Sequence, residues 1–380
     1  MRTQMRAQSM TLLLRAGLLT LLALGATFLL DPYRNYQLAT SAGAFAAVAG
    51  LTLLVGLTGQ LSLGHAVLMA AGGYGYALTA TWVAGTLDGT PAADGVVGWL
   101  LPLLTGVAGA LVVSGVLGLL LGLAAARLRG PYLAGLTLAL VIALPSAAST
   151  LPGLSGEQGV SAPFVPVPEV LSALIAVEQW HAWLAIVVTA CAVTPLVAVR
   201  SGRTGLRMRA VHDDETASRL AGVDPGRVKT GAFVISSLAA GLGGVVLAIV
   251  TQQVSPGAYG LGFSLLLVVA AVVGGLGSLG GAAIGAVLVT LLPWVVDQVT
   301  SGLPADLGHR LQGNLEIVLF GVVVIVVTVL WPGGLARLRT TRNFFRGTRP
   351  PRSTRPPRST RPSQNARLSQ NTQLSQNTER

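Results

Sequence analysis

The sequence predicts an all-α polytopic membrane protein with about ten transmembrane helices and with both termini in the cytoplasm. Of the 380 residues, 52% are hydrophobic and only 10% are charged, whereas soluble domains carry roughly 25% charged residues. The mean hydropathy is +0.68. Apolar runs of about 20 residues, the length that a helix needs to cross a bilayer, recur along the chain. These observations together favour a chain embedded in lipid.

Ten apolar segments are long enough to be spans. They are 12–30, 38–57, 63–83, 99–125, 132–151, 181–199, 231–250, 261–279, 282–299 and 315–331. The first is interpreted as a span because Leu18–Leu30 continues into a polar segment without an Ala-x-Ala-type cleavage site. Gly-rich stretches around 58–75 and 274–286 interrupt the apolar pattern, and the segments 58–65 and 274–281 could be part of continuous spans or could be re-entrant.

The basic residues predict the orientation of these spans. Arg2 and Arg6 precede the first span, Arg127 follows the fourth, and seven basic residues lie between Arg200 and Lys229 after the sixth. With ten spans, all of these clusters and the Arg-rich C-terminal tail fall on one side, which the positive-inside rule identifies as the cytoplasm. Four tryptophans lie at the predicted outer ends of spans, where interfacial aromatics are common: Trp82, Trp99, Trp180 and Trp183.

The sequence divides into a transmembrane domain, 1–336, and a cytoplasmic tail, 337–380, that is rich in Arg, Pro and Ser. The formal net charge is +11, but residues 334–380 alone hold eleven Arg and one acidic residue. The charge therefore does not indicate a nucleic-acid partner. The tail is of low complexity, and we expect it to be disordered. Its arginines could contact anionic lipid headgroups or could be solvated without a role in transport.

Motifs for catalysis or metal binding are absent from the sequence. There is no His-Glu-x-x-His or Gly-x-Ser-x-Gly motif, and Val228 precedes the only lysine, Lys229, so no Gly-x-x-x-x-Gly-Lys phosphate loop exists. The single cysteine, Cys191, allows no intrachain disulfide, and we expect its thiol to be buried. We expect no enzymatic activity, no cofactor and no metal. No predicted span holds a carboxylate at mid-depth, which disfavours a proton- or sodium-coupled carrier.

The predicted cytoplasmic loop, about 200–230, has the capping pattern of two helices. Asp213 or Asp214 can cap a short helix that has Glu215 in its first turn and that ends at Gly222. A second helix would begin at the next Asp-Pro pair and enter the membrane after the lysine. The loop could dock an ATPase or could be an ordinary positive-inside loop. The candidate docking residues are Asp213, Asp214, Glu215, Ala217, Leu220 and Gly222.

Two segments share the pattern Gly-x-x-Ser-Leu-Gly, namely Gly59–Gly64 and Gly275–Gly280. Broken helices at corresponding places in two halves of a chain mark binding sites in many transporters. Polar side chains in apolar surroundings need partners or water. They could therefore line a translocation path or could make ordinary hydrogen bonds between helices. The candidates for the path are Gln60, Ser62, His65 and Ser278.

Several segments resemble those of one family. Gly56–Ala66, which reads Gly-Leu-Thr-Gly-Gln-Leu-Ser-Leu-Gly-His-Ala, is similar to the signature of the LivM-type permeases of branched-chain amino-acid ABC importers. Further similar segments follow in the family's order over roughly residues 40–335. They are Arg127–Tyr132, Leu136–Ala139, Thr204–Ala210, Ala221–Val223, Lys229 with Ala232–Ser236, Val254–Pro256, Gly274–Gly280 and Trp331–Leu335.

The resemblance implies an all-α permease in the bacterial plasma membrane. The partners that it implies are the membrane, a second LivH-type permease subunit, two cytoplasmic ATPase subunits and an extracytoplasmic substrate-binding protein. The implied substrates are branched-chain amino acids, with urea and short amides for related permeases. Glu215 and Ala217 with Gly222 follow the Glu-Ala-Ala-x-x-x-Gly pattern of importer permeases only loosely, and the tail has no expected counterpart. The alternatives are a secondary carrier for a small polar solute and a membrane-embedded enzyme.

Overall fold

The structure, a computed structural model, describes residues 17–90, 95–128, 130–151, 153–154, 156–301 and, near the end, 321–322, 325–326 and 329. The chain divides into two units, 1–338 and 339–380, and all of the described residues belong to the first. The predicted tail and most of the predicted span 315–331 lie outside the described residues.

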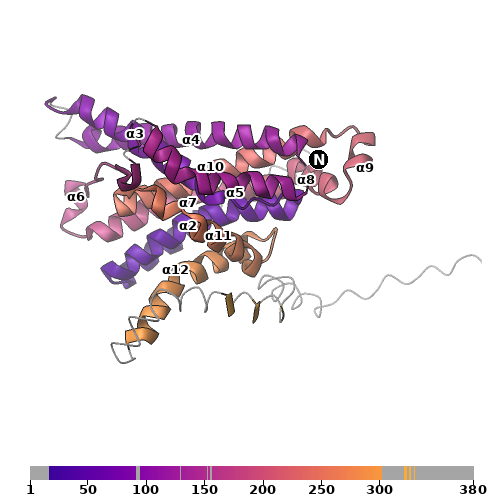
Figure 1. Ribbon diagram of the computed structural model, residues 1–380. Helices are drawn as coiled ribbons and strands as arrows, with labels where there is room; N and C mark the ends of the chain where they lie inside the picture. The colour runs from indigo at the N-terminus through magenta and orange to yellow at the C-terminus, as the bar shows by residue number, and fades with distance from the viewer. Residues whose placement is uncertain are drawn as a thin grey trace, which may run out of the picture. The chain divides into compact units, whose positions relative to one another are not determined.

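The regular structure of the described part is helical apart from two short strands, in agreement with the predicted all-α class (Figure 1). An apolar helix covers Gly17–Leu29, of which the last three residues form the 3-10 helix η1. The longer helices are α2 (Pro32–Thr58), α3 (His65–Leu87), α4 (Val96–Arg127), α5 (Pro131–Thr150), α7 (Val177–Ser201), α8 (Arg203–Asp213), α10 (Pro225–Thr251), α11 (Leu261–Gly274) and α12 (Leu279–Ser301). The short elements are η2 (Gly156–Gln158), β1 (Val160–Ser161), α6 (Glu169–Ser172), α9 (Glu215–Leu220), β2 (Gln253–Val254) and η3 (Pro256–Tyr259).

Six helical segments in the described part are long and apolar enough to cross a membrane. They are Pro32–Thr58, Val96–Arg127, Pro131–Thr150, Val177–Ser201, Pro225–Thr251 and Pro256–Gly274. α3 and α12 coincide with two more of the predicted spans. The chain is therefore a polytopic α-helical membrane protein, while the count of ten spans and the cytoplasmic location of the termini stay predictions.

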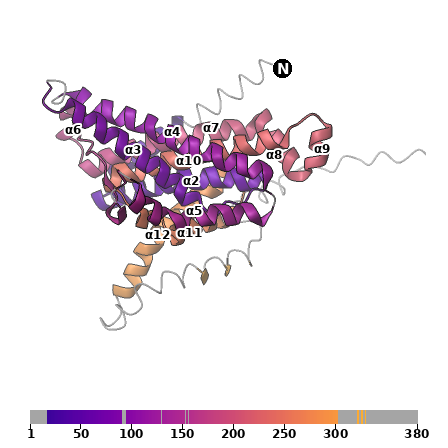
Figure 2. The same ribbon diagram turned by 45° about the horizontal axis from the view of Figure 1, so that its top comes forward.

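Helices α2 and α10 form the centre of the helix bundle (Figure 2). Within their most apolar windows, 72% of α2 and 78% of α10 is buried, compared with 28% of α4. Helix α10 contacts α2, α3, α4 and α7. Lipid provides no hydrophobic drive for helices to associate, so their association depends on close van der Waals packing. Small residues allow the helix backbones to approach closely enough for this packing. For example, Gly43 of α2 lies against Gly243 of α10.

The paired residues give the direction of each central helix. Helix α2 runs antiparallel to α10, because Gly43 lies beside Gly243 and Gly50 lies beside Ser236. Helix α3 runs parallel to α10, because His65 bonds Ser236 and Gly72 lies beside Gly241. The end of α2, the start of α10 and the helices α8 and α9 therefore gather at one end of the bundle (Figure 1). We call it the basic end, because it holds the seven basic residues from Arg200 to Lys229.

The opposite end holds the predicted aromatic residues and the only strands of the described part. Trp180 lies 5.8 Å from Trp99 and 6.4 Å from Trp183 between ring centroids, so three of the four tryptophans cluster there. β1 pairs antiparallel with β2, with Val160 opposite Val254. The segment between α5 and α7 is thereby attached to the end of α10.

Two predictions are wrong in detail. Cys191 is exposed on α7 rather than buried, because its position in an apolar run does not tell which face of the helix carries it. The predicted span 261–279 is too long, since α11 ends at Gly274. Gly275 and Gly277 then adopt positive φ angles of 104° and 77° and turn the chain into α12.

Candidate functional site

The first candidate site is the non-helical segment between α2 and α3, Gly59–Gly64. Gly59 ends α2 in the left-handed conformation, with φ of 68°, and its N–H donates to the carbonyl of Val55 at 3.0 Å. Glycine is the residue that adopts this conformation most readily. A Cβ atom there would also clash with Nδ1 of His212 in α8. Gly59 therefore both ends the helix and lets α8 pack closely over this point.

This segment runs from the basic end into the middle of the bundle. Gly59 lies against α8, whereas His65, the first residue of α3, bonds Ser236. Ser236 is eleven residues into α10, which is about 16 Å along the helix axis at 1.5 Å per residue. Helix α3 thus begins about halfway along α10, and a stretch of non-helical backbone lies between it and the basic end. Such backbone is tolerated in a membrane only where protein buries it or where it lines a wet cavity.

Three polar side chains of this region are buried without a full set of partners. Gln60 is 5% exposed, and Ser62 and His65 are 0% exposed. Both amide atoms of Gln60, the Ser62 hydroxyl and His65 Nδ1 make no hydrogen bond within the described residues. A buried polar group without a partner costs a few kcal/mol, roughly 1 to 3 by mutational estimates. The structure therefore brings the three predicted residues together as a set of unsatisfied polar side chains inside the bundle.

Side chains from three other helices hold the backbone of the segment and the histidine that follows it. The N–H of Leu63 donates to the Thr137 hydroxyl of α5 at 3.0 Å, and the Ser264 hydroxyl of α11 donates to the carbonyl of Leu63 at 2.5 Å. Ser236 of α10 lies 3.1 Å from Nε2 of His65. Thr137, Ser236 and Ser264 were not among the residues predicted to form the path. The sequence feature that could have identified them is a hydroxyl side chain within an otherwise apolar span.

The second Gly-Ser segment packs against α2 close to the first. The N–H of Gly277 donates to the carbonyl of Thr52 at 3.2 Å. Ser278 is half-buried, and its hydroxyl accepts the N–H of Gly281 at 3.2 Å in the first turn of α12. No hydrogen bond in the described part joins Ser278 to the other three candidates. Ser278 is therefore the one predicted path residue whose side chain has no unsatisfied buried polar atom in the described part, because its hydroxyl bonds the first turn of α12.

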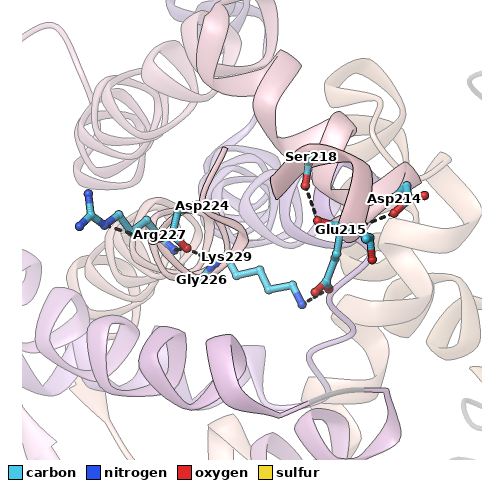
Figure 3. A network of polar contacts seen from close by, with 8 residues as sticks. Asp214, Glu215, Ser218, Asp224, Gly226, Arg227 and Lys229 are labelled. Atoms are coloured by element: carbon cyan, nitrogen blue, oxygen red, sulfur yellow. Dashed lines mark hydrogen bonds and ion pairs between the residues drawn. The ribbon is translucent and has the colours of Figure 1, made fainter. Parts of the chain in front are cut away.

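The second candidate site is the helical hairpin at the basic end, formed by α9 and the start of α10 (Figure 3). Asp214 caps α9, accepting the N–H groups of Thr216 and Ala217 at 2.7 and 3.0 Å. After α9, Gly222 takes a positive φ of 80°, as the capping pattern predicted. Asp224 caps α10 by accepting the N–H groups of the second and third residues after it at 2.9 and 3.4 Å. The predicted pair of capped helices is confirmed, with Asp214 rather than Asp213 as the cap.

This hairpin exposes most of the side chains predicted to dock a partner. Leu220 is 88% exposed. Leu206 of the neighbouring helix α8, which was not among the predicted residues, is 62% exposed. Four more candidates are exposed as well, namely Asp213, Asp214, Ala217 and Gly222. Helix α8 itself was not predicted as a regular helix. Glu215 is only partly exposed, because it forms an ion pair with Lys229 of α10 (Figure 3), a contact that no sequence spacing indicated.

The comparisons with known proteins agree on one family. The model for the permease component of the branched-chain amino acid transport system matches residues 34–328. The chain is 29% identical over 267 residues to the high-affinity branched-chain amino acid transport system permease protein LivM of Salmonella typhimurium. It is 28% identical over 274 residues to the LivM protein of Escherichia coli. Each alignment covers 64% of this chain and 58% of the relative, so the chain spans less than two thirds of these relatives. No solved structure matches.

Proposed function

The chain belongs to the permease-component family of branched-chain amino acid transport systems, and from this premise we propose that it is a membrane-spanning subunit of an ABC importer. Its substrates are branched-chain amino acids or a related small polar solute such as urea or a short amide. It works in the bacterial plasma membrane with a second LivH-type permease, two cytoplasmic ATPase subunits and an extracytoplasmic binding protein. The ATPases supply the energy, because the sequence has no phosphate loop of its own.

The observation that carries this proposal is the set of unsatisfied polar side chains at mid-depth of the bundle. Gln60, Ser62 and His65 are buried, yet the amide, the hydroxyl and one ring nitrogen have no hydrogen-bond partner in the described part. The backbone that carries them is fixed by α5 and α11. Such side chains are suited to contact a polar solute, or the water that accompanies it, at a fixed depth. We assign the translocation path to these three residues, with Ser278 as a further candidate beside α2.

The hairpin at the basic end supports ATPase docking. Its caps satisfy the first N–H groups of both helices, so the hairpin holds its shape without a partner. Its exposed face combines an apolar residue, Leu220, with charged neighbours. Leu220, at 88% exposed, is available to contact another protein. We propose that Asp213–Gly222 occupies a groove on the ATPase.

Reconstitution tests this function. Vesicles that contain this chain and its partner permease alone are expected not to concentrate a branched-chain amino acid. Uptake should require the ATPases, ATP and the binding protein together. Placing Pro at Leu220 should break α9 and lower substrate-stimulated ATP hydrolysis, while the protein still inserts in the membrane. Uptake driven by a sodium or proton gradient alone, without ATPase subunits, would instead identify a secondary carrier.

A further inference from the structure

One ion pair ties the surface hairpin to the central helix of the bundle. Nζ of Lys229 in α10 donates to Oε1 of Glu215 in α9, fourteen residues earlier in the chain. The lysine side chain is only 10% exposed and the carboxylate side chain 34%.

The Glu215–Lys229 pair differs from the other ion pairs of the described part. Those two pairs, Arg34 with Asp31 and Arg227 with Asp224, each join exposed side chains three residues apart. The Glu215–Lys229 pair is thus the one that joins separate elements. It is also the one largely shielded from solvent, where dissolved salt screens the attraction least.

Helix α9 has few other attachments to the bundle. Of its six residues, only Ser218 is buried. The Asp214 cap and the turn at Gly222 stabilise the internal structure of the hairpin, but they do not fix where α9 lies against the membrane helices. The position of α9 on α10 therefore depends on the four-residue turn 221–224 and on the ion pair, which is the one side-chain hydrogen bond between the two helices in the described part.

Helix α10 connects this ion pair to the polar segment at mid-depth. Lys229 and Ser236 are seven residues apart, which places them on the same face, two turns or about 10 Å from each other. Ser236 contacts Nε2 of His65 at 3.1 Å. The only proline of α10 is in its first turn, so the helix between the two contacts is uninterrupted. A displacement of α10 at Lys229 would be passed to Ser236.

We propose that the Glu215–Lys229 ion pair is a latch through which movement of α9 is passed to α10 and, by way of Ser236, to the polar segment at His65. The proposal rests on the proposed docking of the ATPase on α9. When the ATPase displaces α9, α10 follows, because separation of the pair would leave the Lys229 ammonium buried without its counter-ion. Lys229 is in this account a positioning residue rather than a contact for the solute or the ATPase.

The test uses the complete importer reconstituted in liposomes, with substrate-stimulated ATP hydrolysis and copurification of the ATPase as its readouts. Glu215→Gln and Lys229→Met are each expected to lower the stimulation roughly fivefold or more. Copurification is expected to be unchanged in Lys229→Met, because Lys229 is buried and lies outside the docking segment Asp213–Gly222. The reversed double variant, Glu215→Lys with Lys229→Glu, should recover most of the stimulation. Arg34→Gln is the control, since it breaks an exposed ion pair outside the hairpin and should have no effect.

Two results would overturn the latch. Wild-type stimulation in both single variants would show that the pair transmits nothing. Loss of ATPase copurification in Glu215→Gln, without recovery in the reversed double variant, would make Glu215 a direct contact for the ATPase. A wild-type complex that shows no substrate-stimulated hydrolysis would instead contradict the proposed function itself, and the latch with it.

Discussion

The hairpin at the basic end and the segment Gly59–Gly64 are both short and polar and both contain a glycine with a positive φ angle, yet they satisfy their polar groups in different ways. In the hairpin, Asp214 and Asp224 accept backbone N–H groups two and three residues away. In the segment, the backbone is held by side chains from distant helices, and Gln60 has no partner in the described part. The hairpin is built to keep its shape, whereas the segment keeps polar atoms free for another molecule.

Gly222 of the hairpin and Gly64 of the segment are also needed for different reasons. Gly222 has φ of 80° and no atom within 4 Å of the position of an added Cβ. Gly64 has a negative φ, which any residue can adopt, but an added Cβ would clash with the carbonyl oxygen of Thr137. Glycine is therefore needed for its conformation at Gly222 and for close packing at Gly64.

The largest effect is expected for Gly64→Ala. The added methyl group would push against the backbone of α5, which cannot yield as a flexible side chain does, and overpacking of this kind costs roughly 1 to 3 kcal/mol. The shift would also disturb the hydrogen bond from Leu63 to Thr137. We expect a lower midpoint of thermal unfolding and loss of most uptake. Wild-type values of both would show that the segment is not tightly held.

Asp214→Ala should have a smaller effect that is confined to the hairpin. Loss of the N-cap costs about 0.5 to 2 kcal/mol, so α9 should fray and stimulated ATP hydrolysis should fall several-fold, with normal membrane insertion. Asp214→Asn is the matched control, because Asn caps helices about as well as Asp. If the Asn variant loses as much activity as the Ala variant, the charge matters and the cap does not.

Gly222→Ala should be milder still in its consequences. A left-handed conformation costs an L-residue about 1 kcal/mol or somewhat more, and no steric clash adds to this at an open position. Gly222→Asn should cost less, since Asn tolerates this conformation better. A Gly222→Ala variant as defective in uptake as Gly64→Ala would contradict the distinction between the two regions.

The smallest effect is expected when the chain is ended after Arg339. The repeats beyond it cannot bury enough apolar surface to offset the entropy lost on ordering them, so uptake should stay at the wild-type level. Loss of assembly with normal insertion would show that the tail binds a partner.

The hairpin could be predicted from the sequence because its interactions are local. The cap at Asp214, the stop at Gly222 and the second start at Asp224 all lie within a few residues of the groups they satisfy. The apolar helices were predictable for a similar reason, since length and hydropathy suffice. The exposure of Cys191 was not, because it depends on which face of α7 the bundle covers.

The environment of the segment could be predicted only in part. Its polar residues and its glycines were evident, but the contacts with Thr137, Ser236 and Ser264 span 74 to 201 residues of sequence. The ion pair between Glu215 and Lys229 likewise needs the fold that places α9 against α10. Long-range partners of this kind follow from the packing of whole helices and not from local spacing.

Thiol accessibility at Ser62 tests the central claim most directly. Ser62→Cys would be compared with Ser237→Cys, each in a Cys191→Ala background. Both serines are 0% exposed, but the Ser237 hydroxyl donates to the carbonyl of Val234 at 2.8 Å, whereas that of Ser62 has no partner in the described part. In the assembled importer, Ser62→Cys should react with a small water-soluble thiol reagent at a rate that changes with the ATP state, and Ser237→Cys should not react. Equal failure of both variants to react in every state would contradict a path through this segment.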